Sequence, residues 1–98
     1  MINNQELILH YTNESINGFL KITVSPASVD LDKYKWKTDK FYTLDDGTRA
    51  LYRGDFDLGY EMRFQKDGLH YRVAIGNKKY LKKKFQAEDL IEIVESMQ

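Results

Sequence analysis

A chain of 98 residues has room for one domain with a modest hydrophobic core, and we expect a single domain over residues 1–98. Its hydrophobic fraction of 42% and charged fraction of 31% are typical of a soluble globular protein. The lack of cysteine excludes disulfides and thiolate chemistry, and no apolar run is long enough for a transmembrane helix or a signal peptide. We therefore expect a cytoplasmic protein with no membrane partner.

The 15 basic and 15 acidic side chains cancel, but they are distributed in blocks. Residues 60–85 carry a net charge of +6, and residues 86–98 carry a net charge of −4. The whole molecule has no net field that would attract nucleic acid or a membrane, whereas the basic block is a local candidate for anion binding. The excess of lysine over arginine, with many Ile, Asn and Tyr residues, is typical of an AT-rich bacterial or phage genome.

In the first half of the chain, turn residues separate two pairs of alternating segments. Residues 6–12 and 19–25 flank a polar turn, and residues 41–44 and 49–53 flank an Asp-Asp-Gly turn. Alternation of apolar and polar residues on both sides of a turn predicts a β-hairpin in each case.

Between these hairpins, residues 33–37 alternate lysines with Tyr34 and Trp36. The pattern fits a short strand, or the end of a short helix that follows Pro26. The two rings are expected to lie in the core; if they were exposed, they could stack on single-stranded nucleic acid. Residues 54–59 predict a loop.

The second half begins with an Asp-Gly dipeptide at residues 67–68, between alternating segments at 60–66 and 69–75. This is the strongest short-range signal for a hairpin, and a two-residue turn sets the large apolar side chains of both strands on one face. The same register places Arg63 opposite Arg72 on the other face. Because like charges directly opposite each other are unfavourable, we expect a bound anion to offset them.

Residues 79–85 alternate again, and a three-residue turn at 76–78 predicts a third strand beside residues 69–75. In this register Lys82 lies next to Arg72, whereas a four-residue loop would shift the strand by one residue and dissolve the arrangement. With the shorter turn, the outward face carries six candidates for binding an anion or nucleic acid: Arg63, His70, Arg72, Tyr80, Lys82 and Lys84.

The C-terminal residues 86–97 have apolar side chains at helical spacing and acidic side chains between them, which predicts an amphipathic helix. The fold class we expect is α+β and mostly antiparallel β, with about seven short strands joined as hairpins in a curled sheet or small barrel and the helix packed on it. The expected core is Leu7, Leu9, Leu20, Ile22, Val24, Trp36, Met62, Phe64, Tyr71, Val73, Leu90, Ile91 and Val94.

The sequence contains no motif for catalysis, a cofactor or a metal. His10 and His70 lack the ligand spacing of a zinc site. The acidic residues 45–46 are typical turn formers, and Asp55 with Asp57 is at most a candidate acid–base pair. We therefore expect no cofactor, no metal and no enzymatic activity.

Two functional hypotheses follow. The first is a small non-enzymatic interaction module that binds a macromolecular partner, most simply a protein, as accessory, inhibitor or immunity-type proteins of bacteria and phages do. The alternative is a nucleic-acid-binding domain that uses a basic three-stranded sheet face over residues 60–85. Residues 60–97 resemble the arm-binding domains of phage and transposon integrases in strand order and in outward basic and aromatic positions, and this resemblance implies DNA reading by a sheet.

Two further points stay open at this stage. The lysines of residues 78–84 are explained more simply as a solvated face that protects a sheet edge. An uncovered edge strand would also allow a homodimer by strand addition, and the sequence does not decide the oligomeric state.

Overall fold

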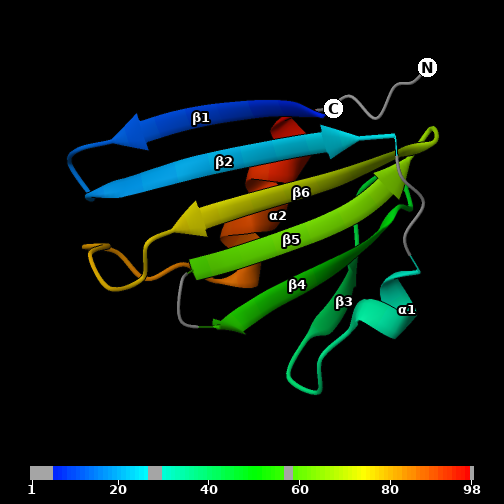
Figure 1. Ribbon diagram of the computed structural model, residues 1–98. Coiled ribbons are helices and arrows are strands. Elements are labelled where there is room, and N and C mark those ends of the chain that lie inside the picture. The colour runs from blue at the N-terminus through cyan, green and yellow to red at the C-terminus, as the bar shows by residue number, and fades with distance from the viewer. Residues whose placement is uncertain (1–5, 27–29, 57–58, 98) are drawn as a thin grey trace.

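The computed structural model describes residues 6–26, 30–56 and 59–97 of the chain. Its strands are β1 (Leu7–Asn13), β2 (Gly18–Ser25), β3 (Lys40–Thr43), β4 (Arg49–Phe56), β5 (Gly59–Lys66) and β6 (Leu69–Gly76), and its helices are α1 (Leu31–Tyr34) and α2 (Ala87–Ser96). In the described part of the chain the strands form one antiparallel, six-stranded sheet in the order β1-β2-β6-β5-β4-β3, which is not closed into a barrel. Helix α2 crosses behind this sheet (Figure 1), so the expected fold class is confirmed.

Three of the four predicted hairpins are present, namely those of residues 6–25, 41–53 and 60–75. The turn at residues 67–68 has positive φ angles of 53° at Asp67 and 78° at Gly68, as a two-residue turn between twisted strands requires. The β5–β6 register pairs Phe64 with Tyr71 and continues to the ends of both strands, as the sequence predicts. The loop predicted at residues 54–59 is wrong in part, because β4 continues to Phe56 with a register shift that follows Arg53.

The predicted strand at residues 79–85 is wrong, and with it the three-residue turn at 76–78. Strand β2 pairs with β6 instead, with Ile22 opposite Val73. The edge of β6 that residues 79–85 were expected to use is therefore taken by a strand from the N-terminal hairpin. Residues 77–86, which we call the basic loop, run as turns and bends from β6 to α2.

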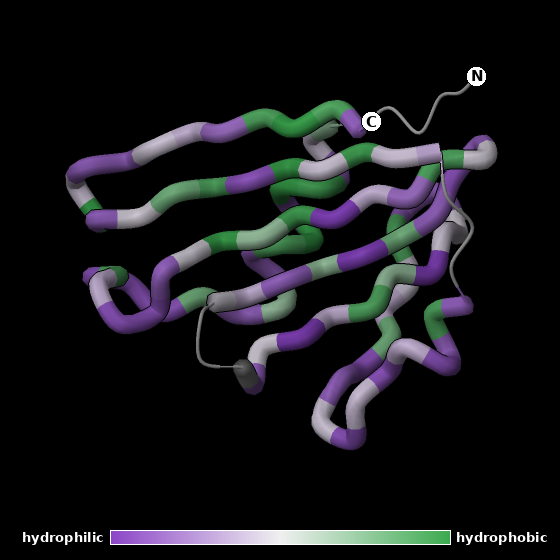
Figure 2. Tube along the Cα trace, in the orientation of Figure 1, coloured by the Kyte–Doolittle hydropathy of each residue, from purple (hydrophilic) through white to green (hydrophobic). Residues whose placement is uncertain are grey.

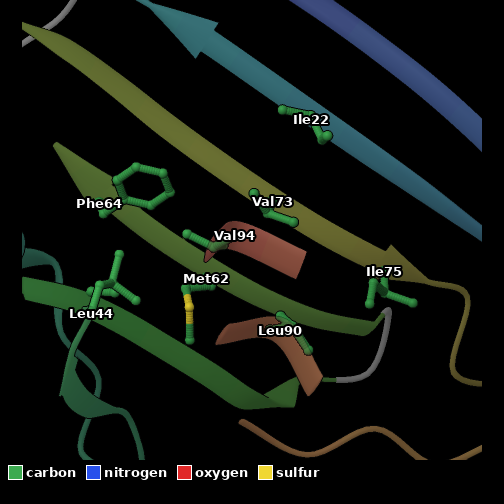
Figure 3. Close-up of a cluster of buried hydrophobic side chains, with 9 residues drawn as sticks. Ile22, Leu44, Met62, Phe64, Val73, Ile75, Leu90 and Val94 are labelled. Atoms are coloured by element: carbon green, nitrogen blue, oxygen red, sulfur yellow. The ribbon is translucent and has the colours of Figure 1, made fainter. Parts of the chain in front are cut away.

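The core lies between the sheet and α2, on the side that we call the helix face; the opposite side is the outer face. Figure 3 shows Leu90 and Val94 of α2 directed at Met62 and Val73 of the sheet. Six expected core residues are buried and four more pack against them in part: Ile22, Met62, Phe64, Val73, Leu90 and Val94, then Leu20, Val24, Tyr71 and Ile91.

Three expected core residues are exposed: Leu7, Leu9 and Trp36. Trp36 follows α1 on the outer face, where its ring stacks on the guanidinium of Arg53 at 3.6 Å. Helix α1 begins after Asp30, whose side chain accepts a hydrogen bond from the Asp32 amide, so the short-helix interpretation of this segment holds. Residues 33–37, in which lysines alternate with Tyr34 and Trp36, therefore span the C-terminal end of α1.

Candidate functional site

On the outer face, Arg63 and Arg72 lie opposite each other as the hairpin register predicts. A carboxylate of the chain itself lies between them. Glu61 accepts hydrogen bonds from Nε and Nη2 of Arg63 at 3.1 and 3.2 Å, and another from Nε of Arg72. The expectation that a bound anion must offset the two arginines is therefore corrected, because Glu61 supplies the negative charge.

A third arginine extends this group towards β4. Arg53 lies opposite Glu61 in the β4–β5 register, with 3.9 Å between its Nη1 and a Glu61 oxygen. Its Nε and Nη2 donate to Asp39 Oδ2 at 2.9 and 2.6 Å, and Nη2 also donates to the Tyr34 carbonyl at 2.8 Å. We call this set the arginine cluster: Arg53, Arg63, Arg72, Asp39 and Glu61.

The arginine cluster fixes the segment after α1 to the sheet. The side chains of Arg53 and Asp39 are almost completely buried, as is that of Glu61. Burial of Glu61 opposes its ionisation, but the hydrogen bonds from Arg63 and Arg72 outweigh this effect and lower its pKa. The cluster is thus held as charged groups, which is stable only while every buried charge keeps a partner.

His70 lies next to this cluster and is 6% exposed. Its Nε2 is 3.2 Å from Nη1 of Arg63. Because a guanidinium can only donate, Nε2 is the acceptor and the ring proton is on Nδ1, which has no hydrogen-bond partner in the described part of the chain. Burial and then the Arg63 cation lower the pKa of His70 from 6.5, against the opposite effect of Glu61.

This lowered pKa makes stability depend on pH. The unfolded chain takes up a proton on this histidine at a higher pH than the folded protein does. We expect the contribution of His70 to the free energy of unfolding to be fully present above pH 6.5. This contribution should be lost as the pH decreases through the lowered pKa. Urea unfolding at a series of pH values checks this, and His70→Gln should weaken the dependence while His10→Gln should preserve it. An unchanged pH dependence in His70→Gln would contradict the assignment.

The six predicted site residues separate into two groups. Arg63, His70 and Arg72 share the outer face, as predicted. Tyr80, Lys82 and Lys84 lie in the basic loop and not on the sheet, so the predicted row of basic side chains across three strands does not form. The reason is that β2 occupies the place beside β6. The strand order that carried the resemblance to integrase arm-binding domains is therefore not present.

The basic loop is attached to the turn between β1 and β2. The Lys82 amide donates to the Ile16 carbonyl at 2.8 Å, and the Asn17 side chain donates to the Tyr80 carbonyl at 3.0 Å. A Cβ on Gly18 would lie 2.6 Å from a methyl group of Leu81, so the side chain of Leu81 packs closely over this glycine. The lysine side chains at residues 79 and 82–84 remain exposed to solvent.

Strand β1 presents a second surface. All seven of its residues are exposed, although Leu7, Leu9 and Tyr11 point to the helix face through their pairing with β2. These three side chains, which we call the apolar edge, are 56%, 38% and 54% exposed. Figure 2 shows the hydrophobic start of β1 at the margin of the sheet, where β1 is the last strand in the strand order.

A groove joins the apolar edge to the centre of the helix face. It has a volume of about 430 Å³ and lies between the β1–β2 hairpin, the basic loop and α2. Its apolar lining includes Tyr11, Leu20, Ile75, Phe85 and Ile93. The groove and the apolar edge are continuous through Tyr11, so together they form an extended apolar surface of a kind that is typical of binding sites.

The acidic residues that the sequence analysis considered for a catalytic or metal site do not form such a site in the described part of the chain. Asp46 accepts from the Thr48 amide at 2.9 Å and from Lys66 Nζ at 2.6 Å, which is the behaviour of a turn former. Asp55 is exposed, and its predicted partner Asp57 lies outside the described residues. Within the described ranges, no group of three or more His, Asp or Glu side chains is placed to hold a metal, and no helix is long and apolar enough to cross a membrane.

No known protein family matches this chain, and neither a curated protein nor a solved structure is significantly similar to it. The surfaces of the protein are therefore the guide to its function. Sequence reasoning missed Glu61 and Asp39 as partners of the arginines. For Glu61 a signal existed, because it precedes Arg63 by two residues and so shares its face of the strand. For Asp39 the sequence holds no such signal.

Proposed function

We propose that the protein is a small interaction module that binds another protein along the apolar edge and the adjoining groove. The observation that carries this proposal is the exposure of Leu7, Leu9 and Tyr11 on the face of the sheet that holds the hydrophobic core. The proposed role is binding without a chemical step, and the proposed place of action is the cytoplasm.

The outer edge of β1, with which no other strand pairs among residues 6–26, 30–56 and 59–97, supports the same proposal. Natural edge strands are protected by charges, proline, bulges or short length, because an open edge pairs with other chains. Residues 7–13 contain no charged residue and no proline. The opposite edge, β3, is four residues long and begins with Lys40. Of the two edges, β1 is therefore the one suited to accept a strand from a partner.

A capture experiment with matched variants tests this proposal. The tagged protein is crosslinked in cells from a photoreactive residue at position 12 of β1, and Leu9→Asp is compared with Lys82→Glu. We expect the wild type and Lys82→Glu to retain the same protein partner and Leu9→Asp to lose it, because a charge at the apolar edge cannot be buried in an interface. Both variants alter exposed residues, so both should fold.

Loss of the partner in Lys82→Glu with retention in Leu9→Asp would overturn the proposal. If nuclease treatment also removed the captured material, the nucleic-acid alternative would replace it. That alternative stays a prediction. It is supported by the exposed lysines of the basic loop together with Tyr80, which is 57% exposed. Against it, Arg53 and Arg63 direct most of their donors at groups within the protein, and two carboxylates already offset part of the charge of the sheet arginines.

A further inference from the structure

We propose that a hollow on the outer face, between β2 and β6, binds a phosphate group. This site is on the opposite side of the sheet from the groove and goes beyond the proposed protein interface. The hollow has a volume of about 330 Å³, and it is lined by Glu6, Ile8, Lys21, Thr23, Ser25, Arg63, His70 and Arg72.

The strand register places the polar groups of this hollow side by side. Thr23 lies opposite Arg72, and Ser25 lies opposite His70, in the β2–β6 pairing. Lys21 is two residues before Thr23 and therefore shares its face of β2. Neighbouring side chains on one face of paired strands stand close enough to contact a single small ligand.

The donors in this hollow are available. Arg72 uses Nε for Glu61, and in the described part of the chain its Nη1 and Nη2 have no acceptor. The Lys21 ammonium and the hydroxyls of Thr23 and Ser25 likewise have no hydrogen-bond partner among residues 6–26, 30–56 and 59–97. Two guanidinium nitrogens on one arginine form the fork that binds two oxygens of an oxyanion.

The charge of the hollow favours an anion. In the arginine cluster, three guanidinium groups face the carboxylates of Asp39 and Glu61, so one positive charge is left over. Lys21 adds another positive charge, and Glu6 at the rim removes one. His70 adds none in its neutral form, in which Nε2 accepts from Arg63. The Glu61 carboxylate also holds Arg72 in place, so the free end of its guanidinium is already oriented.

The number and types of donors indicate phosphate and not carboxylate. A carboxylate has two oxygens, which the Arg72 fork alone would satisfy. A phosphate monoester has three terminal oxygens and carries about −1.5 to −2 charges near neutral pH, so it can also use the ammonium and the hydroxyls. The ligand is therefore inorganic phosphate or a phosphomonoester.

A titration followed by amide NMR tests this site. Inorganic phosphate and O-phosphoserine are added at an ionic strength held constant with sodium chloride. We expect saturable shifts at Thr23, Ser25 and Arg72 with either ligand. Tighter binding of O-phosphoserine would identify an ester as the preferred source, and equal or weaker binding would identify the free ion. Arg72→Gln should weaken the affinity about tenfold or more, because it removes a charge-assisted pair of hydrogen bonds.

Two variants make the result specific. Thr23→Val keeps the shape of the side chain but removes the hydroxyl, and it should weaken binding several-fold. Lys82→Gln removes an exposed charge from the basic loop, outside the hollow, and should leave the titration unchanged. Linear shifts without saturation, equal effects of chloride, or an unchanged affinity in Arg72→Gln would each overturn the proposal.

Discussion

Glu61→Gln is expected to destabilise the protein by about 3 kcal/mol, since removal of one partner from a buried ion pair leaves charges that no other group neutralises. The side chain of Glu61 is 5% exposed and contacts Arg53, Arg63 and Arg72. An amide can accept a hydrogen bond but carries no charge, so it cannot hold three guanidinium groups together. Urea unfolding at neutral pH measures the loss, which is a large part of the about 5–15 kcal/mol that holds a domain folded.

The same pair of proteins gives a distinct result in acid. The lowered pKa of Glu61 means that its contribution is fully present above pH 4.5 and is lost as the pH falls through its folded value. The difference between wild type and Glu61→Gln should therefore be largest near neutral pH and shrink below pH 4.5. Glu92→Gln, an exposed change on α2, serves as the control and should stay within about 0.5 kcal/mol of wild type. Equal stability of both variants would show that the cluster contributes nothing.

Leu90→Ala is expected to destabilise the protein by about 2–5 kcal/mol, because it leaves a cavity between α2 and the sheet. Leu90 is fully buried, and it belongs to the same core cluster as Met62 and Val94. The change also removes much of the contact that holds the last helix on the sheet, so the chemical denaturation midpoint should fall markedly.

Leu7→Ala is the matched control for this substitution. It makes the same change at a leucine that is 56% exposed, and the expected loss is about 0.5 kcal/mol or less. Equal losses in the two variants would contradict the packing of α2 described here. If Leu7→Ala weakens partner binding while the fold is kept, the apolar edge is needed for recognition and not for stability.

Local sequence signals were sufficient for the hairpins and the terminal helix. The Asp67-Gly68 turn set the register of β5 and β6 by itself, because a two-residue turn allows one pairing that keeps the apolar side chains on one face. The spacing of Leu90 and Val94 likewise placed α2 on the core.

The sequence predicted correctly which residues are buried in the central strands and in α2. It did not predict which residues are buried in the edge strand β1. Leu9 and Ile22 lie opposite each other on one face with the same alternation, yet Ile22 is buried and Leu9 is 38% exposed. The difference is their place in the sheet, since β1 is the edge strand and all seven of its residues are exposed, whereas Ile22 belongs to the core cluster that includes Leu90 and Val94 of α2. A periodic pattern shows which way a side chain points, but not what lies above it.

The sequence by itself therefore determined which segments pair through short turns, which face of each is apolar, and that a terminal helix covers a mostly antiparallel sheet. The tertiary structure alone decided that β2 and not residues 79–85 lies beside β6, and that Asp39 meets Arg53. Short-range pairings are encoded by turn chemistry. Pairings between distant segments depend instead on which of several similar alternating strands buries more apolar surface, and that is a property of the whole chain.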